Sequence, residues 1–284
     1  MQDAPSLPDD MQPWSAGYGV IQHNDSTLSR LKTLLDKTGD PVTRGRWLAL
    51  LTAADRLTCM GMWLVANMTY VQRPRLDGQP LTADDFKQTP EGHTGGALNM
   101  VPAYVGYLLA NSLSGKTRSW LMGQGHCVAA IDAVNLLTGN LSPAHAQRYR
   151  LDEAGLARFV ADFYHYGVKA DGYPQSPLGS HVNAYTAGGI MEGGYLGFAE
   201  LQYAHMPLPD QSLVAFLSDG AFEEQRGSDW TPRWWRGQDC GDLLPVMIAN
   251  GRRIDQRTSL SQSGGSSWFA GHLTLNGFDP ITID

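Results

Sequence analysis

Two oxygen-bearing side chains, Asp219 and Asn250, each follow an apolar run that is typical of a buried parallel strand. Residues 213–217 lead to Asp219, and residues 243–249 lead to Asn250. Ligands of an open α/β sheet bind beyond the carboxyl ends of its strands, so both side chains are expected at one edge. A carboxylate and an amide oxygen suit Mg²⁺, which fills its octahedron with water and phosphate oxygens. The alternative is ordinary turn chemistry, because Asp-Gly and Asn-Gly are also common turn pairs.

Three histidines occupy similar settings along the chain. His93, His126 and His181 each follow a glycine or a glycine-serine turn, beside a predicted strand or helix end. A single histidine of this kind is typical of a structural or surface residue. Three of them together with a metal-type Asp and Asn indicate a site that moves protons, because imidazole titrates near neutral pH.

The elements that must position these residues alternate between helix and strand patterns. This alternation predicts an α/β fold with a doubly wound, mostly parallel sheet flanked by helices. An irregular N-terminal arm is expected over residues 1–26, and one large domain over residues 27–284. The expected helices cover residues 27–36, 44–71, 97–113, 127–137, 152–164 and a stretch from the glycine-rich 188–194 segment to about residue 206. The expected strands cover residues 119–122, 213–217 and 243–249.

Composition and charge narrow the class of protein. A chain of 284 residues with 42% hydrophobic and 17% charged residues can bury a substantial core. The formal charge of −7, without any dense Lys/Arg block, argues against nucleic acid or an anionic membrane as the main partner. The first residues lack the character of a signal peptide, so a cytoplasmic protein is expected. Cys59, Cys127 and Cys240 lie far apart, so neither a disulfide framework nor a zinc site is expected.

Several short segments, taken in order and spacing, resemble the amino-terminal domain of phosphoketolases over roughly residues 45–284. The spacing from Asp219 to Asn250 (250 − 219 = 31 residues) is also similar to the metal and diphosphate motif of thiamine diphosphate enzymes. The segments that carry the resemblance are residues 92–93, 121–126, 180–181, 190–197, 219–220, 244–246 and 250–251.

The resemblance implies a thiamine diphosphate- and Mg²⁺-dependent aldehyde-lyase of carbohydrate metabolism. Such an enzyme cleaves xylulose 5-phosphate or fructose 6-phosphate with inorganic phosphate, giving acetyl phosphate and a shorter aldose phosphate. The implied metal ligands are Asp219, the Asn250 side chain and the Arg252 backbone carbonyl. The residues implied to lie against the diphosphate are Gly220 and Gly193. The residues implied to face the thiazolium and the substrate are His93, His126 and His181.

The chain departs from the family pattern at four places. Ser218 precedes the metal ligand where the family has glycine, and Met191 stands where the family has histidine. Residues 123–128 and 221–223 also differ from the family's glycine-rich and acidic motifs. These changes bear on the choice of substrate and on the step that uses phosphate.

Relatives of this kind hold the cofactor between two domains, and the second, pyrimidine-binding domain supplies an activating Glu. Neither that domain nor the family's C-terminal domain is recognised in this sequence. The chain is therefore expected to be a truncated piece or one subunit of a split enzyme, weakly active or inactive alone. A homodimer, or a partner subunit or domain that supplies the Glu, is expected. Two alternatives stay open: a transketolase-like half that transfers a two-carbon unit, and a non-catalytic scaffold that retains the fold.

Overall fold

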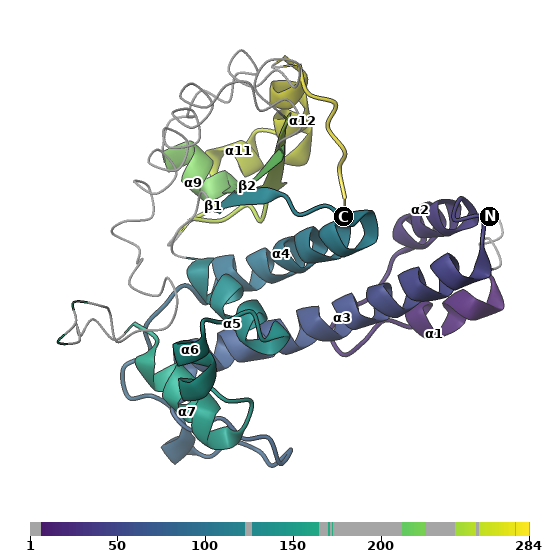
Figure 1. Ribbon diagram of the computed structural model, residues 1–284. Coiled ribbons are helices and arrows are strands. Elements are labelled where there is room, and N and C mark those ends of the chain that lie inside the picture. The colour runs from purple at the N-terminus through teal and green to yellow at the C-terminus, as the bar shows by residue number, and fades with distance from the viewer. Residues whose placement is uncertain are drawn as a thin grey trace.

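The computed structural model of the chain describes residues 7–122, 127–164, 170, 172, 212–224, 242–253, 256–275 and 277–283. Helices dominate these residues, with a small sheet on one side (Figure 1). The 3₁₀ helices are η1 (Asp9–Met11) and η2 (Ala83–Asp85). The α-helices are α1 (Gln12–Ser15), α2 (Asp25–Asp36), α3 (Pro41–Tyr70), α4 (Thr94–Ser114), α5 (Val128–Thr138), α6 (Pro143–Arg148), α7 (Glu153–Asp162), α9 (Asp219–Glu224), α11 (Ser259–Gln262) and α12 (Ser266–Leu275). The strands are β1 (Ser119–Met122), β2 (Ser212–Ser218) and β3 (Asp242–Ile248).

The three predicted strands are confirmed, and so are the predicted helices that fall on described residues. Side chains that cap the helix starts explain several of the boundaries. Asn24 Oδ1 accepts from the Thr27 amide at 2.8 Å, and Asp40 Oδ1 accepts from the Thr43 amide at 2.8 Å. The helix expected from residue 97 begins earlier, at Thr94. The predicted helix that ends near residue 206 lies outside the described residues.

The sheet is parallel, with the strand order β1-β2-β3. Met122 pairs with Phe216, and Ser218 pairs with Ile248, so the carboxyl ends of β2 and β3 are level. A small parallel sheet among many helices is an α/β arrangement, as the sequence predicted. The chain turns from β2 directly into α9, which places Asp219 at the junction.

The main hydrophobic core lies between the sheet and the helices that cover it. α4 contacts β2 and β3 on one side, and it contacts α3 and α5 on the other. Figure 1 shows α4 between the sheet and α3. Phe216 of β2, Met100 of α4 and Phe159 of α7 are almost completely buried in this core. Burial of a large apolar side chain stabilises the fold by about 1.5–3 kcal/mol, so this core is the main support of the sheet.

The N-terminal residues pack along α3. Met11 and Trp14 are buried with Leu35 and Leu51, and Trp14 stacks on His23 with ring centroids 4.0 Å apart. His23 Nε2 lies 2.8 Å from a carboxylate oxygen of Asp55, which is in the middle of α3. Among the described helices, α3 alone is long and apolar enough, by length and composition, to cross a membrane. α3 packs against α4 and α5, and its Asp55 side chain is buried.

Lys87 connects the C-terminal ends of α3 and α7. Its ammonium donates to the Met68 carbonyl near the end of α3 and to the Val160 carbonyl near the end of α7, both at 2.7 Å. A cation is favourable at helix C-termini, where carbonyls lack partners within the helix. Burial lowers the pKa of Lys87 to about 8, with Glu91 acting in the opposite direction.

We predict that Lys87→Met destabilises the chain by about 2–3 kcal/mol, because two buried carbonyls lose a charged donor. Urea unfolding followed by circular dichroism measures this change. Lys116→Met is the matched control, because Lys116 is exposed after the end of α4. Equal unfolding midpoints for the two variants would contradict the role assigned to Lys87.

Candidate functional site at the carboxyl ends of the strands

Asp219 is the buried acid at the end of β2, with 1% of its surface exposed. One carboxylate oxygen accepts from the Gly251 amide at 2.7 Å and from the Thr258 hydroxyl at 3.2 Å. The other oxygen accepts from the Gly220 amide at 3.0 Å. A carboxylate offers about four acceptor positions, so these three donors, counted among the described residues, leave room for one further partner. The acid at the end of β2 therefore reaches the loop that follows β3.

The loop after β3 turns at Asn250 and Gly251. The Asn250 side chain is exposed, and its Oδ1 accepts from the Arg252 amide at 3.0 Å, which is a local turn contact. Gly251 has a φ of 72°, in the left-handed region that favours glycine. The turn chemistry considered as the alternative is therefore present here. An amide oxygen has two lone pairs, so this contact still leaves Asn250 able to bind an ion.

Gly220 lies against the backbone of the same loop. A Cβ atom built on Gly220 would lie 2.8 Å from the Arg252 carbonyl oxygen and 3.5 Å from Cγ of Arg253. The predicted metal-site residues Asp219 and Arg252 are thus brought together, with Gly220 between them. A side chain at position 220 would clash with the Arg252 carbonyl, so glycine permits this close approach of the two backbones.

The electrostatic setting of Asp219 favours a bound cation. Burial raises the pKa of Asp219, although hydrogen bonds from Gly251, Thr258 and Gly220 act in the opposite direction. Within the described part of the chain, Asp219 forms no ion pair with a basic side chain. A divalent ion at the open acceptor position would compensate a charge that is held away from water.

The sequence patterns did not identify two residues of this site, Thr258 and Glu223. Thr258 is completely buried against Asp219, and Glu223 lies one helical turn after Asp219 on α9. Glu223 accepts from the Ser259 hydroxyl at 2.7 Å and from the Leu260 amide at 3.2 Å. The acidic character of residues 219–224 was the one signal that pointed toward Glu223.

Of the predicted histidines, the structure describes His93. It is the N-cap residue of α4, and its side chain is partly exposed. The last turns of α4 contact the start of β1, because Tyr107 Oη donates to the Arg118 carbonyl. α4 therefore runs antiparallel to the strands, and its first residues point toward the carboxyl ends. His126, His181 and Gly193 lie outside the described residues, so their roles stay predictions.

Cys127 is the N-cap residue of α5, and it is buried. Burial raises the pKa of its thiol to about 12, so it is protonated at neutral pH. Among the described residues, no group of three or more His, Cys, Asp or Glu side chains is placed to bind a metal. The remaining ligands of a cation at Asp219 would therefore be amide, carbonyl, water or phosphate oxygens, as is common for Mg²⁺.

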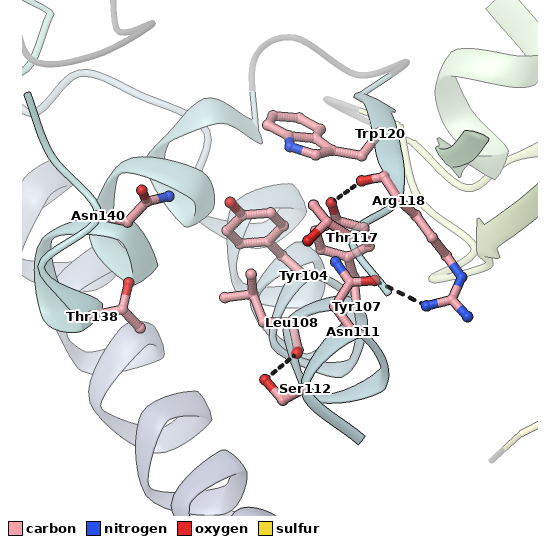
Figure 2. Close-up of a pocket in the computed structure, with 10 residues that line it drawn as sticks. All are labelled: Tyr104, Tyr107, Leu108, Asn111, Ser112, Thr117, Arg118, Trp120, Thr138 and Asn140. Atoms are coloured by element: carbon pink, nitrogen blue, oxygen red, sulfur yellow. Dashed lines mark hydrogen bonds between the residues drawn. The ribbon is translucent and has the colours of Figure 1, made fainter. Parts of the chain in front are cut away.

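A separate pocket of about 600 Å³ lies at the opposite end of the strands, beside the start of β1 (Figure 2). Its lining residues are Tyr104, Tyr107, Leu108, Asn111, Ser112, Thr117, Arg118, Trp120, Thr138 and Asn140. Some of its polar groups bond to one another: Arg118 donates to Asn111 Oδ1 at 3.0 Å, and the Ser112 hydroxyl donates to the Leu108 carbonyl at 2.9 Å. The lining residues of this pocket include no acidic side chain, unlike the site at Asp219.

Comparison with known proteins adds independent findings. Residues 49–283 match the family described as the XFP N-terminal domain. The chain is similar to the probable phosphoketolase of Bifidobacterium animalis subsp. lactis, with 29% identity over 238 residues, which are 78% of this chain and 27% of that protein. It is also similar to the probable phosphoketolase of Schizosaccharomyces pombe, with 28% identity over 203 residues, covering 69% of this chain and 23% of that protein. The chain spans about a quarter of the length of these relatives.

Proposed function

Because the chain belongs to the XFP N-terminal domain family, we propose that it is the part of a phosphoketolase that binds thiamine diphosphate and Mg²⁺. The whole enzyme would cleave xylulose 5-phosphate or fructose 6-phosphate with inorganic phosphate, giving acetyl phosphate and an aldose phosphate. The observation that carries this proposal is the contact between Asp219 and the 250–252 loop at the level carboxyl ends of β2 and β3. The proposal includes a doubly wound sheet of the thiamine diphosphate-binding type, to which β1, β2 and β3 belong.

The metal site is proposed from the oxygen atoms gathered at these strand ends. Asp219 would supply a carboxylate oxygen, Asn250 its amide oxygen, and Arg252 its backbone carbonyl. Two observations support the fit: Asp219 is a desolvated acid with an acceptor position that no described residue fills, and the lack of a side chain at Gly220 lets the Arg252 carbonyl approach the start of α9 closely. Gly220, together with Gly193, would let the diphosphate approach the backbone closely.

The histidines would handle protons beside the metal site. When bound, thiamine diphosphate supplies the nucleophilic carbon and the electron sink that carbon–carbon cleavage requires. His93, the N-cap residue of α4, or His181 would donate a proton to the carbonyl oxygen of the ketose. His126 and His181 are proposed to orient the substrate and to protonate its departing hydroxyl. A homodimer, or a partner subunit or domain that carries the activating Glu, would complete the site.

Calorimetry with thiamine diphosphate tests this proposal. We predict saturable binding heat in the presence of Mg²⁺ and its loss when EDTA removes the ion, because the diphosphate would be held through the metal. Mn²⁺ is expected to restore the heat. Absence of Mg²⁺-dependent binding would leave the alternative of a scaffold that retains the fold.

Product analysis separates phosphoketolase chemistry from transketolase-like transfer. The purified chain, alone and with the rest of a phosphoketolase, is supplied with xylulose 5-phosphate, thiamine diphosphate and Mg²⁺. Acetyl phosphate that forms only when phosphate is present supports the proposed reaction. A longer ketose that forms from an added aldose without phosphate would contradict it.

A further inference from the structure

We propose that Glu223 and Thr258 are positioning residues that hold the loop after β3 in place for the metal bound by Asp219. This inference rests on the proposed function, because it concerns the same ion. Neither side chain is proposed to touch the ion. Each would act by fixing the backbone that presents Asn250 and the Arg252 carbonyl.

Backbone contacts join residues 251–253 to residues 256–258 of the loop after β3. The Thr258 amide donates to the Gly251 carbonyl at 3.0 Å, and the Arg253 amide donates to the Gln256 carbonyl at 2.8 Å. Arg252 and Arg257 form an antiparallel bridge between these contacts. Because these contacts connect the two sides of the loop, fixing residues 251 and 258 also fixes the position of the Arg252 carbonyl.

Thr258 fixes one end of this loop to Asp219. Its hydroxyl donates to Asp219 Oδ2 at 3.2 Å and accepts from the Ser261 amide at 3.2 Å, as the N-cap of α11. One hydroxyl therefore uses its donor on the acid and an acceptor on the next helix. Because Thr258 is fully buried, these two contacts are not replaced by water when they are lost.

Glu223 fixes the segment that follows the loop. Asp219 and Glu223 are four residues apart on α9, so both side chains lie on one face of the helix. Glu223 accepts from the Ser259 hydroxyl and the Leu260 amide, and Nη1 of Arg253 lies 3.4 Å from its Oε1. Burial acts to raise the pKa of Glu223, but the hydrogen bonds from Ser259 and Leu260 outweigh it and lower the pKa. The carboxylate therefore stays charged and ties three groups of the loop region to α9.

Asp219 and Glu223 thus have different roles. Asp219 would bind the ion directly, while its contacts with Gly251 and Thr258 set the orientation of its carboxylate. Glu223 would keep the opposite wall of the site at a fixed distance from α9. Residues that orient metal ligands in this way commonly change metal affinity by 10- to 100-fold when they are replaced.

The test uses isosteric variants and two readouts. Thr258→Val removes the hydroxyl and keeps the shape of the side chain. Thr258→Ser keeps the hydroxyl and is the matched control. Glu223→Gln removes the negative charge and keeps the size of the side chain. Mg²⁺ affinity is measured by calorimetry at saturating thiamine diphosphate, and hydrogen exchange of the Gly251 and Leu260 amides is followed without any cofactor. We expect Mg²⁺ binding to weaken roughly 10- to 100-fold in Thr258→Val and Glu223→Gln, and to stay near wild type in Thr258→Ser. The Gly251 amide is expected to exchange faster in Thr258→Val, and the Leu260 amide in Glu223→Gln.

The outcomes distinguish the two levels of the proposal. Unchanged Mg²⁺ affinity and exchange in both Thr258→Val and Glu223→Gln, with normal binding by the wild type, would refute the positioning role and leave the proposed function standing. Loss of Mg²⁺-dependent binding in the wild type itself would overturn both. Should Thr258→Val fail to fold, Glu223→Gln alone decides, because its position on α9 is partly exposed.

Discussion

Replacing Asp219 by asparagine is expected to abolish Mg²⁺-dependent binding of thiamine diphosphate, with a loss of affinity of about 100-fold or more. The amide lacks the charge that a divalent ion requires, while its size and its acceptor oxygen are retained. The contacts with Gly251 and Thr258 can therefore persist. Stability without cofactor is expected to change by no more than about 1 kcal/mol, because one hydrogen bond is lost and an unfavourably buried charge is removed.

Calorimetry and thermal unfolding, run side by side, check both parts of this prediction. Asp279→Asn is the matched control, since Asp279 is exposed near the end of the described chain. Cofactor binding by Asp219→Asn at wild-type strength would show that the carboxylate does not hold the ion. A variant that loses both binding and fold would instead assign Asp219 a structural role.

A second large effect is expected at Asp132, in the middle of α5. Its side chain is completely buried, and neither carboxylate oxygen has a hydrogen-bond partner within the described part of the chain. Burial raises the pKa of Asp132 well above its usual value. We predict that Asp132→Val stabilises the chain by about 1–3 kcal/mol at neutral pH, because an unsatisfied buried acid is removed. Urea unfolding measures the difference.

The effect of Asp132 on the stability of the chain should depend on pH. An acid with a raised pKa in the folded state binds more protons than it does in the unfolded chain. Stability is therefore lost as pH rises above the ordinary carboxyl pKa of 3.8, by up to about 1.4 kcal/mol per pH unit, until the folded-state pKa is passed. Asp132→Asn should lack this slope. Parallel pH profiles for wild type and Asp132→Asn would contradict the prediction.

The strand ends were predictable from sequence because their signals are local. An apolar run that breaks into Asp219, and another that breaks into Asn250, contain the strand, its end and the candidate ligand within a few residues. The short strand over residues 119–122 was found for the same reason. Parallel register then brings the ends of β2 and β3 level, and the Gly251 amide reaches Asp219.

The supporting contacts were not predictable because they are remote in sequence. Thr258 reaches Asp219 across 39 positions, and Ser259 reaches Glu223 across 36. They depend on the conformation of a polar loop that has no periodic pattern. Asp132 was missed for a different reason: a single acid in an apolar helix is usually assigned to an exposed face, whereas α5 is buried from Val128 to Leu136. His126, His181 and Gly193 stay predictions from the family resemblance.

A crystal structure of this chain grown with thiamine diphosphate and Mg²⁺ is the most direct test of the proposed site. We predict one ion bound by the Asp219 carboxylate, the Asn250 amide oxygen and the Arg252 carbonyl, each at about 2.0–2.1 Å, with the diphosphate beside Gly220. An ion bound elsewhere, or Asp219 and Asn250 facing separate surroundings while the cofactor is bound, would contradict it.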